Sequence, residues 1–256
     1  MLRNRVRKYL RVHRHSGFSL IELAIAIFVI TLLLGSLLVP LSTQVEQRKI
    51  SETQKALEEI RQALMGFALA YSYLPCPDKT TSAGAGTAND GQEDVNVSGT
   101  CVTPEGNLPW ATLGVTGYDS WGNRFHYRVD DKFSQRTPAS TFTLSTKGDT
   151  LTGGLQVCSI QGCTCITSSL TTCGDGPPAV VLSYGPNGYG AINANTGSAN
   201  PAPTSSDELE NTNGDFKFVS RTASNVGTGA GEFDDIVVWL SREVLLNRMV
   251  AAGRLP

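Results

Sequence analysis

The sequence predicts an α+β protein in which one long N-terminal helix packs against an antiparallel β-sheet head. Three observations predict this fold class: an apolar run over residues 18–41, a polar helical pattern with one apolar face over 42–74, and short β-like runs between Gly, Ser, Thr, Asn and Pro after residue 75. With a basic leader at 1–17, they divide the 256-residue chain into a leader, an apolar helix, a stalk helix and a head at 75–256.

The formal net charge of −2 is the sum of a basic leader and an acidic remainder of the chain. Six of the 21 lysines and arginines lie in the first 17 residues, which contain no acid, so the rest of the chain sets 15 basic against 23 acidic residues, a net charge of −8. A surface of that sign repels phosphate. We therefore expect no nucleic-acid partner.

The apolar run at 18–41 has Glu22 as its only charged residue, and no charge occurs from Leu23 to Val45. At about 1.5 Å per residue, such a helix is long enough to cross a hydrocarbon core of roughly 30 Å. The basic cluster precedes the run and none of similar size follows it. We therefore expect a single membrane-spanning helix with a cytoplasmic N-terminus and an exported head.

The residues at the start of this run resemble a known processing signal. No A-x-A cleavage site follows the apolar run, so an ordinary secretory signal is not expected. Instead, Gly17-Phe18-Ser19-Leu20-Ile21-Glu22 resembles the cleavage site of type IV prepilins and pseudopilins. The resemblance implies that a membrane-embedded prepilin peptidase cuts after Gly17 and methylates the new N-terminal residue, Phe18.

Glu22 is the functional candidate within the run, because a carboxylate in hydrocarbon costs several kcal/mol unless it is paired or neutralised. The resemblance implies that Glu22 neutralises the amine that cleavage creates on Phe18, in its own chain or in a neighbouring subunit during filament assembly. The alternative is an acid near the membrane interface whose side chain reaches the polar headgroups.

The stalk helix presents one apolar face at helical spacing, with Thr53 in the place of a missing apolar residue. The face consists of Ile50, Leu57, Ile60, Leu64, Phe67, Tyr71 and Leu74. Charged residues on the other side are expected to be solvated. The helix should end at Leu74, because the residue before Pro75 is driven out of helical geometry.

The head is expected to form an antiparallel sheet with one buried face, packed against the stalk. The predicted strands are 125–129, 141–144, 179–184, 216–219 and 236–240. Ser241 is suited to cap a short C-terminal helix that ends near Gly253.

All six cysteines lie in the head, where export favours disulfides. We expect Cys76 to join Cys101, and the other four, Cys158, Cys163, Cys165 and Cys173, to pair among themselves in an order that the sequence does not determine. A zinc site is the alternative, although the spacing C-x4-C-x-C-x7-C does not match paired C-x2-C ligands.

Three stretches of the head are similar to the major pseudopilins of type II secretion systems. Residues 118–127 look like the family's D-P-W-G-N-P-Y-x-Y stretch, 183–188 like its S-x-G-A-D-G turn, and 235–239 like its D-I-x-N-W segment. The resemblance implies a structural calcium ion at Asn187 and Asp235, with replacement ligands from the acidic segment 207–210. The alternative is an Asn-Gly turn and an aspartate at a strand edge.

Enzymatic activity is not expected. His13 and His15 belong to the leader, so His126 is the one histidine after it, in a predicted strand where a packed or surface role is the simpler interpretation. The sequence contains no G-x-S-x-G, H-E-x-x-H or phosphate-binding glycine loop.

The resemblances together imply a pilin-like subunit of a type II secretion pseudopilus, either a pseudopilin or a minor pilin. Its expected partners are prepilin peptidase, other pilin or pseudopilin subunits, an inner-membrane assembly platform and membrane lipid. Its expected location is the bacterial inner membrane, with the head in the periplasm. Two alternatives remain: a minor pilin of a type IV pilus, serving adhesion, motility or DNA uptake, and a monomeric membrane-anchored periplasmic binding protein.

Overall fold

The computed structural model describes Gly17 and residues 19–136, 142–148, 154–162, 176–227 and 231–255, with the backbone alone for 35–41. The chain divides into two compact units, Met1–Gln47 and Arg48–Pro256. Helix α1 contributes to both units, and the whole head belongs to the second.

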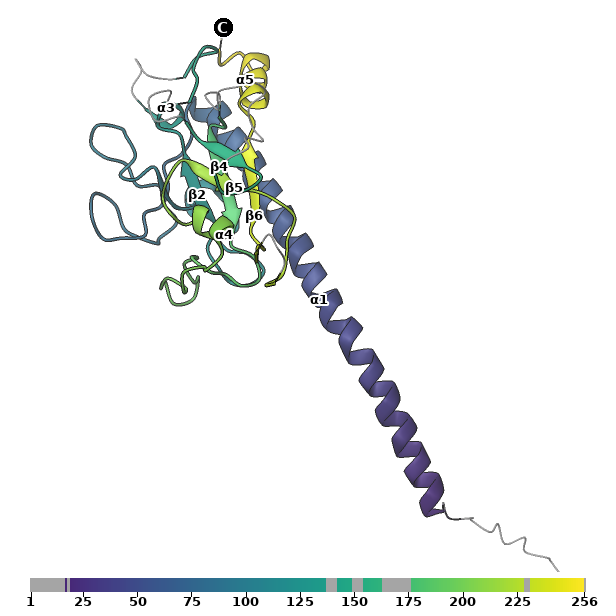
Figure 1. Cartoon of the computed structure of the whole chain (residues 1–256). Coiled ribbons are helices and arrows are strands. Elements are labelled where there is room, and N and C mark those ends of the chain that lie inside the picture. The colour runs from purple at the N-terminus through teal and green to yellow at the C-terminus, as the bar shows by residue number, and fades with distance from the viewer. Residues whose placement is uncertain are drawn as a thin grey trace, which may run out of the picture. The chain divides into compact units, whose positions relative to one another are not determined.

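The chain has the mixed α and β composition that the sequence predicts, with one long helix followed by short elements (Figure 1). In chain order the elements are α1 (Leu20–Tyr71), β1 (Glu105–Asn107), α2 (Trp110–Leu113), β2 (His126–Val129), α3 (Asp131–Ser134), β3 (Gln156–Cys158), β4 (Ala179–Ser183), α4 (Ser206–Glu210), β5 (Lys217–Val219), β6 (Ile236–Leu240) and α5 (Arg242–Ala251).

Helix α1 ends at Tyr71, three residues before the predicted end at Leu74. Ser72 adopts a positive φ of 65° while its N–H still donates to the Ala68 carbonyl at 2.8 Å. A left-handed residue at this position closes a helix. The Leu74 N–H then donates to the Phe133 carbonyl instead, so tertiary contacts end the helix before Pro75 can.

The main sheet is antiparallel, with strand order β1-β2-β4-β6. The predicted strands at 125–129, 179–184 and 236–240 are confirmed as β2, β4 and β6. The predicted strand at 141–144 is wrong, because residues 142–143 are irregular and residue 144 lies in a turn, while residue 141 lies outside the described residues. Strands β1 and β3 were not expected.

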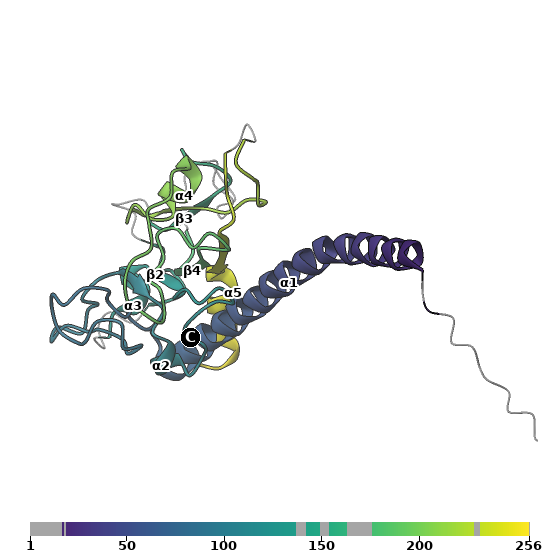
Figure 2. The same ribbon diagram turned by 90° about the horizontal axis from the view of Figure 1, so that it is seen from below.

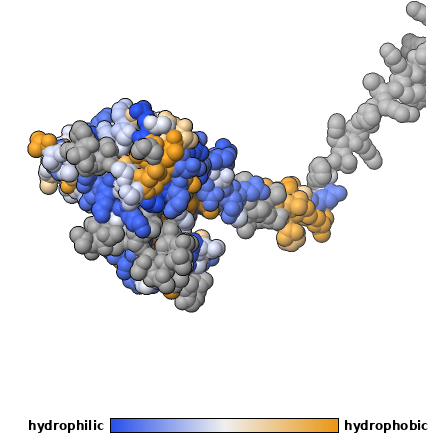
Figure 3. All heavy atoms as spheres, turned by 90° about the horizontal axis from the view of Figure 1, so that it is seen from above, coloured by the Kyte–Doolittle hydropathy of each residue, from blue (hydrophilic) through white to orange (hydrophobic). Residues whose placement is uncertain are grey.

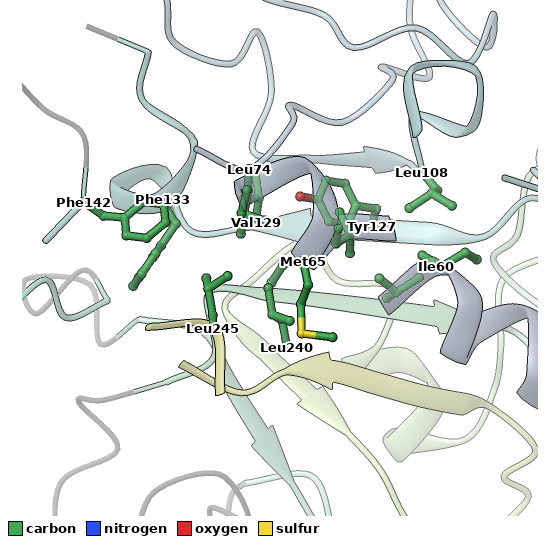
Figure 4. Packing of buried hydrophobic residues seen from close by; sticks show 14 of the residues in the cluster. Ile60, Met65, Leu74, Leu108, Tyr127, Val129, Phe133, Phe142, Leu240 and Leu245 are labelled. Atoms are coloured by element: carbon green, nitrogen blue, oxygen red, sulfur yellow. The ribbon is translucent and has the colours of Figure 1, made fainter. Parts of the chain in front are cut away.

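One face of the main sheet packs against the stalk part of α1 and against α5 (Figure 4). Side chains that alternate along the strands, such as Tyr127 and Val129 on β2, meet Ile60 and Met65 of α1 in this core. The Thr53 hydroxyl fills the gap in the apolar face and accepts the Ser120 N–H at 3.2 Å. Burial of each large side chain here contributes about 1.5–3 kcal/mol.

The predicted apolar face of the stalk is correct at Leu57, Ile60, Leu64 and Leu74 but wrong at Tyr71. Met65 and Ala68 are buried, whereas the Tyr71 side chain is 58% exposed and Phe67 is partly buried. Phe67 and Tyr71 stack on each other with ring centroids 4.5 Å apart. The last helical turns therefore present a slightly rotated face to the core.

The opposite face of the main sheet is also buried, so the expectation of one buried face is wrong. The predicted strand at 216–219 forms β5, which pairs with β3 in a separate parallel two-stranded sheet. Val180 and Leu182 of β4 pack against Val157 and Phe218 of this small sheet. Helix α4 contacts β5, and Figure 2 shows α4 and β3 together on the side of β4 away from the stalk part of α1. All five residues of β4 are consequently buried.

Helix α5 follows the sequence prediction. The Ser241 hydroxyl accepts the Val244 N–H at its start, and Gly253, just beyond its end, has a φ of 67°. The helix closes one end of the main core with Leu245 and Met249.

Candidate functional site

The first candidate site is the start of α1, directly after the predicted cleavage position. Gly17 is exposed and lies outside the helix, while Phe18 lies outside the described residues. A Cβ atom added at Gly17 would meet nothing within 4 Å. Packing against the described residues therefore does not require glycine here, and cleavage after Gly17 stays a prediction.

Ser19 and Glu22 form a capping box at this helix start. The Ser19 backbone N–H and hydroxyl both donate to Glu22 Oε2 at 2.9 Å, and the Glu22 N–H donates to Ser19 Oγ at 3.3 Å. This exchange satisfies backbone donors that a helix start leaves without partners. We did not expect it from the sequence, although Ser-x-x-Glu before an apolar run is its signature.

The capping box gives Glu22 a local role beside the predicted assembly role. The carboxylate is exposed and turned back toward Ser19, whose preceding residue would carry the new amine after cleavage. Oε2 receives both Ser19 bonds, and a carboxylate has about four acceptor positions. It can therefore receive a charged amine without losing the cap.

After Glu22, the described residues of α1 up to residue 34 are exposed and, apart from Thr31, apolar, and Figure 3 shows apolar side chains gathered on this part of the helix. Its exposed large side chains include Leu23, Ile25, Ile27, Phe28, Val29, Ile30, Leu32, Leu33 and Leu34. A continuous apolar surface of this kind marks an interaction site. None of the described helices combines the length and the apolar character that a membrane span requires.

In the head, Asp119 connects two of the stretches that resemble pseudopilins. Its Oδ1 accepts the N–H groups of Trp121 and Asn123 at 3.0 and 2.9 Å, and its Oδ2 accepts the Ser183 hydroxyl at 2.7 Å. Burial raises the pKa of the Asp119 carboxyl, and the Ser183 hydrogen bond opposes that rise. Asp119 therefore holds the 119–123 turn against the end of β4.

The second candidate site is a cluster of three carboxylates, Glu208 of α4 and the consecutive Asp234 and Asp235 before β6. One ligand oxygen from each lies within 4.8 Å of the others. Asn187 connects two of them, because its N–H donates to Asp234 Oδ2 at 2.9 Å and its Nδ2 donates to Glu208 Oε1 at 3.1 Å. Asn211 Nδ2 donates to Asp235 Oδ2 at 2.7 Å. The cluster thus brings together chain segments that are distant in sequence.

Two carboxylates of this cluster, Glu208 and Asp235, are costly to ionise. Burial raises the pKa of Glu208, and it raises that of Asp235 well above its usual range; hydrogen bonds from Asn187 and Asn211 respectively oppose the change. Glu208 is 2% exposed, and its Oε2 has no hydrogen-bond partner among the described residues. A buried carboxylate oxygen without a partner suits a cation that supplies the missing charge.

The structure places the two predicted calcium ligands close to this cluster, in different ways. Asp235 is a member, whereas Asn187 Oδ1 accepts the Tyr189 N–H at 2.9 Å and its amide nitrogen faces Glu208. Within the acidic segment 207–210, Glu208 reaches the cluster, but Asp207 forms an ion pair with Arg221 at 2.6 Å. We did not predict Asp234, although an Asp-Asp pair before a strand was visible in the sequence.

The cysteines are described in part. Cys76 and Cys101 form a disulfide with a Cα–Cα distance of 5.2 Å, which closes the loop after α1. Cys158 is also disulfide-bonded, and no described cysteine is free. Cys163, Cys165 and Cys173 lie outside the described residues, so the pairing of the four late cysteines stays a prediction.

Comparison with known proteins identifies the N-terminal segment. Residues 12–38 match the prokaryotic N-terminal methylation motif. This motif is the type IV pilin-like prepilin cleavage and methylation signal, and it supports a type IV pilin-like precursor that is processed by prepilin peptidase. No curated protein and no solved structure matches the chain.

Proposed function

We propose that this chain is a structural subunit of a type II secretion pseudopilus, assembled through its N-terminal helix after cleavage at Gly17. The observation that carries the proposal is the methylation motif at 12–38, followed within the same segment by a helix with an exposed apolar surface. The choice of a secretion pseudopilus is supported by the pseudopilin-like stretches of the head, two of which meet through Asp119 and Ser183.

Assembly would use the apolar surface of α1 twice. Before assembly, membrane lipid would cover the segment, which anchors the precursor; in the filament, the same side chains would pack against neighbouring subunits. Each large side chain buried contributes about 1.5–3 kcal/mol. Apolar packing alone does not select one axial position of a subunit along the filament. Glu22 would select that position by receiving the Phe18 amine of its own or a neighbouring chain.

We also place a calcium ion in the acidic cluster of the head, with Glu208, Asp234 and Asp235 as carboxylate ligands. The donor set consists of hard oxygens, which calcium prefers, and the partnerless Oε2 of Glu208 fits it. The ion's two positive charges would offset most of the negative charge of three carboxylates held close together. Asn187 and Asn211 orient the carboxylates by hydrogen bonds.

The test has two steps. Intact mass of the chain made together with prepilin peptidase should show residues 18–256 with a methylated amine; a retained leader would overturn the filament role. A deletion strain should then lose protein secretion and regain it with the wild-type gene. Loss of pili with secretion intact would instead assign the chain to a type IV pilus, and loss of neither would favour a monomeric binding protein.

A further inference from the structure

A row of basic side chains lies on the face of the main sheet that points away from α1. Arg124, His126 and Arg128 alternate with Phe125 and Tyr127, which belong to the core on the α1 side. On the adjacent strand β4, the residues of this face are apolar and covered by the small sheet. The basic row lies beside the edge strand β1 and reaches this cover, since the Arg128 guanidinium carbon lies 4.7 Å from the centre of the Phe216 ring.

A cavity of about 420 Å³ opens along this row. Its walls combine the three basic side chains with Glu105 of β1 and with the less polar Tyr184 and Ile192. Ligand pockets for small organic molecules have volumes of roughly 300–1,000 Å³ and a few converging polar groups on partly apolar walls. The cavity therefore has the size and the composition of a small-molecule site.

Two of the basic side chains already contact Glu105. Arg128 Nη1 forms an ion pair with Glu105 Oε2 and also donates to the Gly214 carbonyl at 3.1 Å. His126 Nε2 lies 3.2 Å from Glu105 Oε1. These contacts leave one side of the cavity with balanced charge.

Arg124 differs from the other two. Its guanidinium carbon lies 3.8 Å from the centre of the Trp110 ring, and within the described residues its side chain forms no hydrogen bond or ion pair. Burial lowers the pKa of this guanidinium, and the Asp78 carboxylate, beyond ion-pair distance, partly opposes the change. The wall of the cavity thus holds a half-buried cation that lies against an indole and has no anion at ion-pair distance among the described residues.

We propose that this cavity binds a small organic monocarboxylate, whose carboxylate pairs with Arg124. A guanidinium presents parallel N–H groups that match a carboxylate in a bidentate pair. Glu105 in the same cavity repels a second negative charge, which disfavours phosphate dianions. Tyr184, Ile192 and Pro104 supply surface for an apolar body. The carboxylate belongs either to a free organic acid or to the C-terminus of a short peptide.

The experiment uses matched probes on the full-length chain, purified in detergent. Benzoate and hexanoate represent free acids and a tripeptide represents a chain terminus, each compared with its neutral amide. Binding is followed by isothermal calorimetry and by the melting temperature. We expect at least one acid to bind saturably while its amide does not, and the stronger of the two probe kinds identifies the source of the carboxylate.

The decisive variant is Arg124→Gln, which should raise the dissociation constant at least about tenfold. Arg48→Gln is the matched control, because it removes the same charge from an exposed position on α1 and should leave binding unchanged. The proposal is overturned if no acid binds, if acids and amides bind equally, if phosphate binds more tightly than every carboxylate, or if Arg124→Gln binds like the wild type. The acid and amide comparison on the wild type remains decisive even if Arg124→Gln is unstable.

Discussion

The same four-residue pattern, Ser-x-x-Glu, occurs at the start of α1 and at the start of α4, and its glutamate behaves differently at the two places. In both, the serine hydroxyl accepts the N–H of the glutamate, Glu22 or Glu208. At α1 the glutamate turns back to Ser19. At α4 it turns instead to Asn187 and joins the acidic cluster.

The difference follows from burial. Glu22 is exposed, and no described residue other than Ser19 competes for its carboxylate. Glu208 is buried beside Asn187, Asp234 and Asp235, where hydrogen bonds are electrostatically stronger than in water. The local pattern thus fixes the role of the serine, whereas the tertiary surroundings decide what the acid does.

The strongest test of this contrast separates the two roles of Glu22. Glu22→Gln keeps an acceptor for the Ser19 N–H but loses the charge, whereas Glu22→Ala loses both. Removing one partner of a buried ion pair costs about 3–5 kcal/mol, so incorporation into filaments should fall roughly a hundredfold or more in both variants. Filament incorporation is measured by quantitative blotting of sheared fractions. Wild-type assembly of Glu22→Gln would mean that capping, rather than charge, is what assembly needs.

A second test compares the exposed Glu22 with a buried acid, Asp78. Burial, with smaller contributions from Asp90 and Asp94, raises the pKa of Asp78 from 3.8 to about 6, against hydrogen bonds from the N–H groups of Gly91 and Asn89. Since the folded state then binds the proton more tightly than the unfolded state, stability from this group is greatest below about pH 4 and is lost as the pH rises through 6.

The change should amount to about 3 kcal/mol at most. In urea denaturation, the unfolding free energy of the wild type should rise as the pH falls from 7 to 5. Asp78→Asn should reduce this rise, whereas Glu22→Gln should leave it unchanged. An unaltered slope in Asp78→Asn would show that this carboxyl ionises without penalty.

The third test concerns the acidic cluster. Calcium at a hundredfold excess over its dissociation constant should stabilise the head by about 2.7 kcal/mol, seen as a higher melting temperature that a chelator reverses. Glu208→Gln and Asp235→Asn should abolish the increase, whereas Glu59→Gln, which changes an exposed acid on α1, should keep it. A melting temperature indifferent to calcium would leave the cluster as a set of hydrogen-bonded acids.

The smallest expected effects are those of the two serines. Ser19→Ala and Ser205→Ala each remove a cap worth about 1 kcal/mol. Ser205→Ala should lower the unfolding free energy of the head, and Ser205→Asp should restore it. Ser19→Ala should instead increase hydrogen exchange in the first turn of α1 and leave the melting of the head unchanged. Equal effects of both alanine variants on the head would contradict the contrast between the two sites.

The sequence predicted the helices and strands that the residue preferences of their own segments favour. The apolar run predicted the first half of α1, runs of Val, Ile, Phe and Tyr predicted β2, β4 and β6, and Ser241 predicted the start of α5. Strand β1 consists of Glu105, Gly106 and Asn107, which have little intrinsic preference for a strand, and it forms because β2 pairs with it.

The converse case is the segment around Thr143. It is rich in β-branched residues but forms a turn, in which the Thr143 N–H donates to the Thr146 hydroxyl, and Arg242 binds the Thr146 carbonyl. The acidic cluster was predictable only in part for the same reason. The resemblance implied Asp235 and the segment 207–210, which contains Glu208, but Asp234 was not predicted as a member.

The junction between α1 and the sheet has a mechanical consequence. The chain leaving the helix is held by the Leu74 hydrogen bond to Phe133, by the Tyr127 hydroxyl bond to the Pro75 carbonyl at 3.0 Å, and by the Cys76–Cys101 disulfide. A pulling force that enters through α1 is therefore divided among two hydrogen bonds and a covalent link within three residues. Tension on the stalk loads a central strand of the sheet through Tyr127 and leaves the loop closed by the disulfide intact, so the head can be dragged as one body.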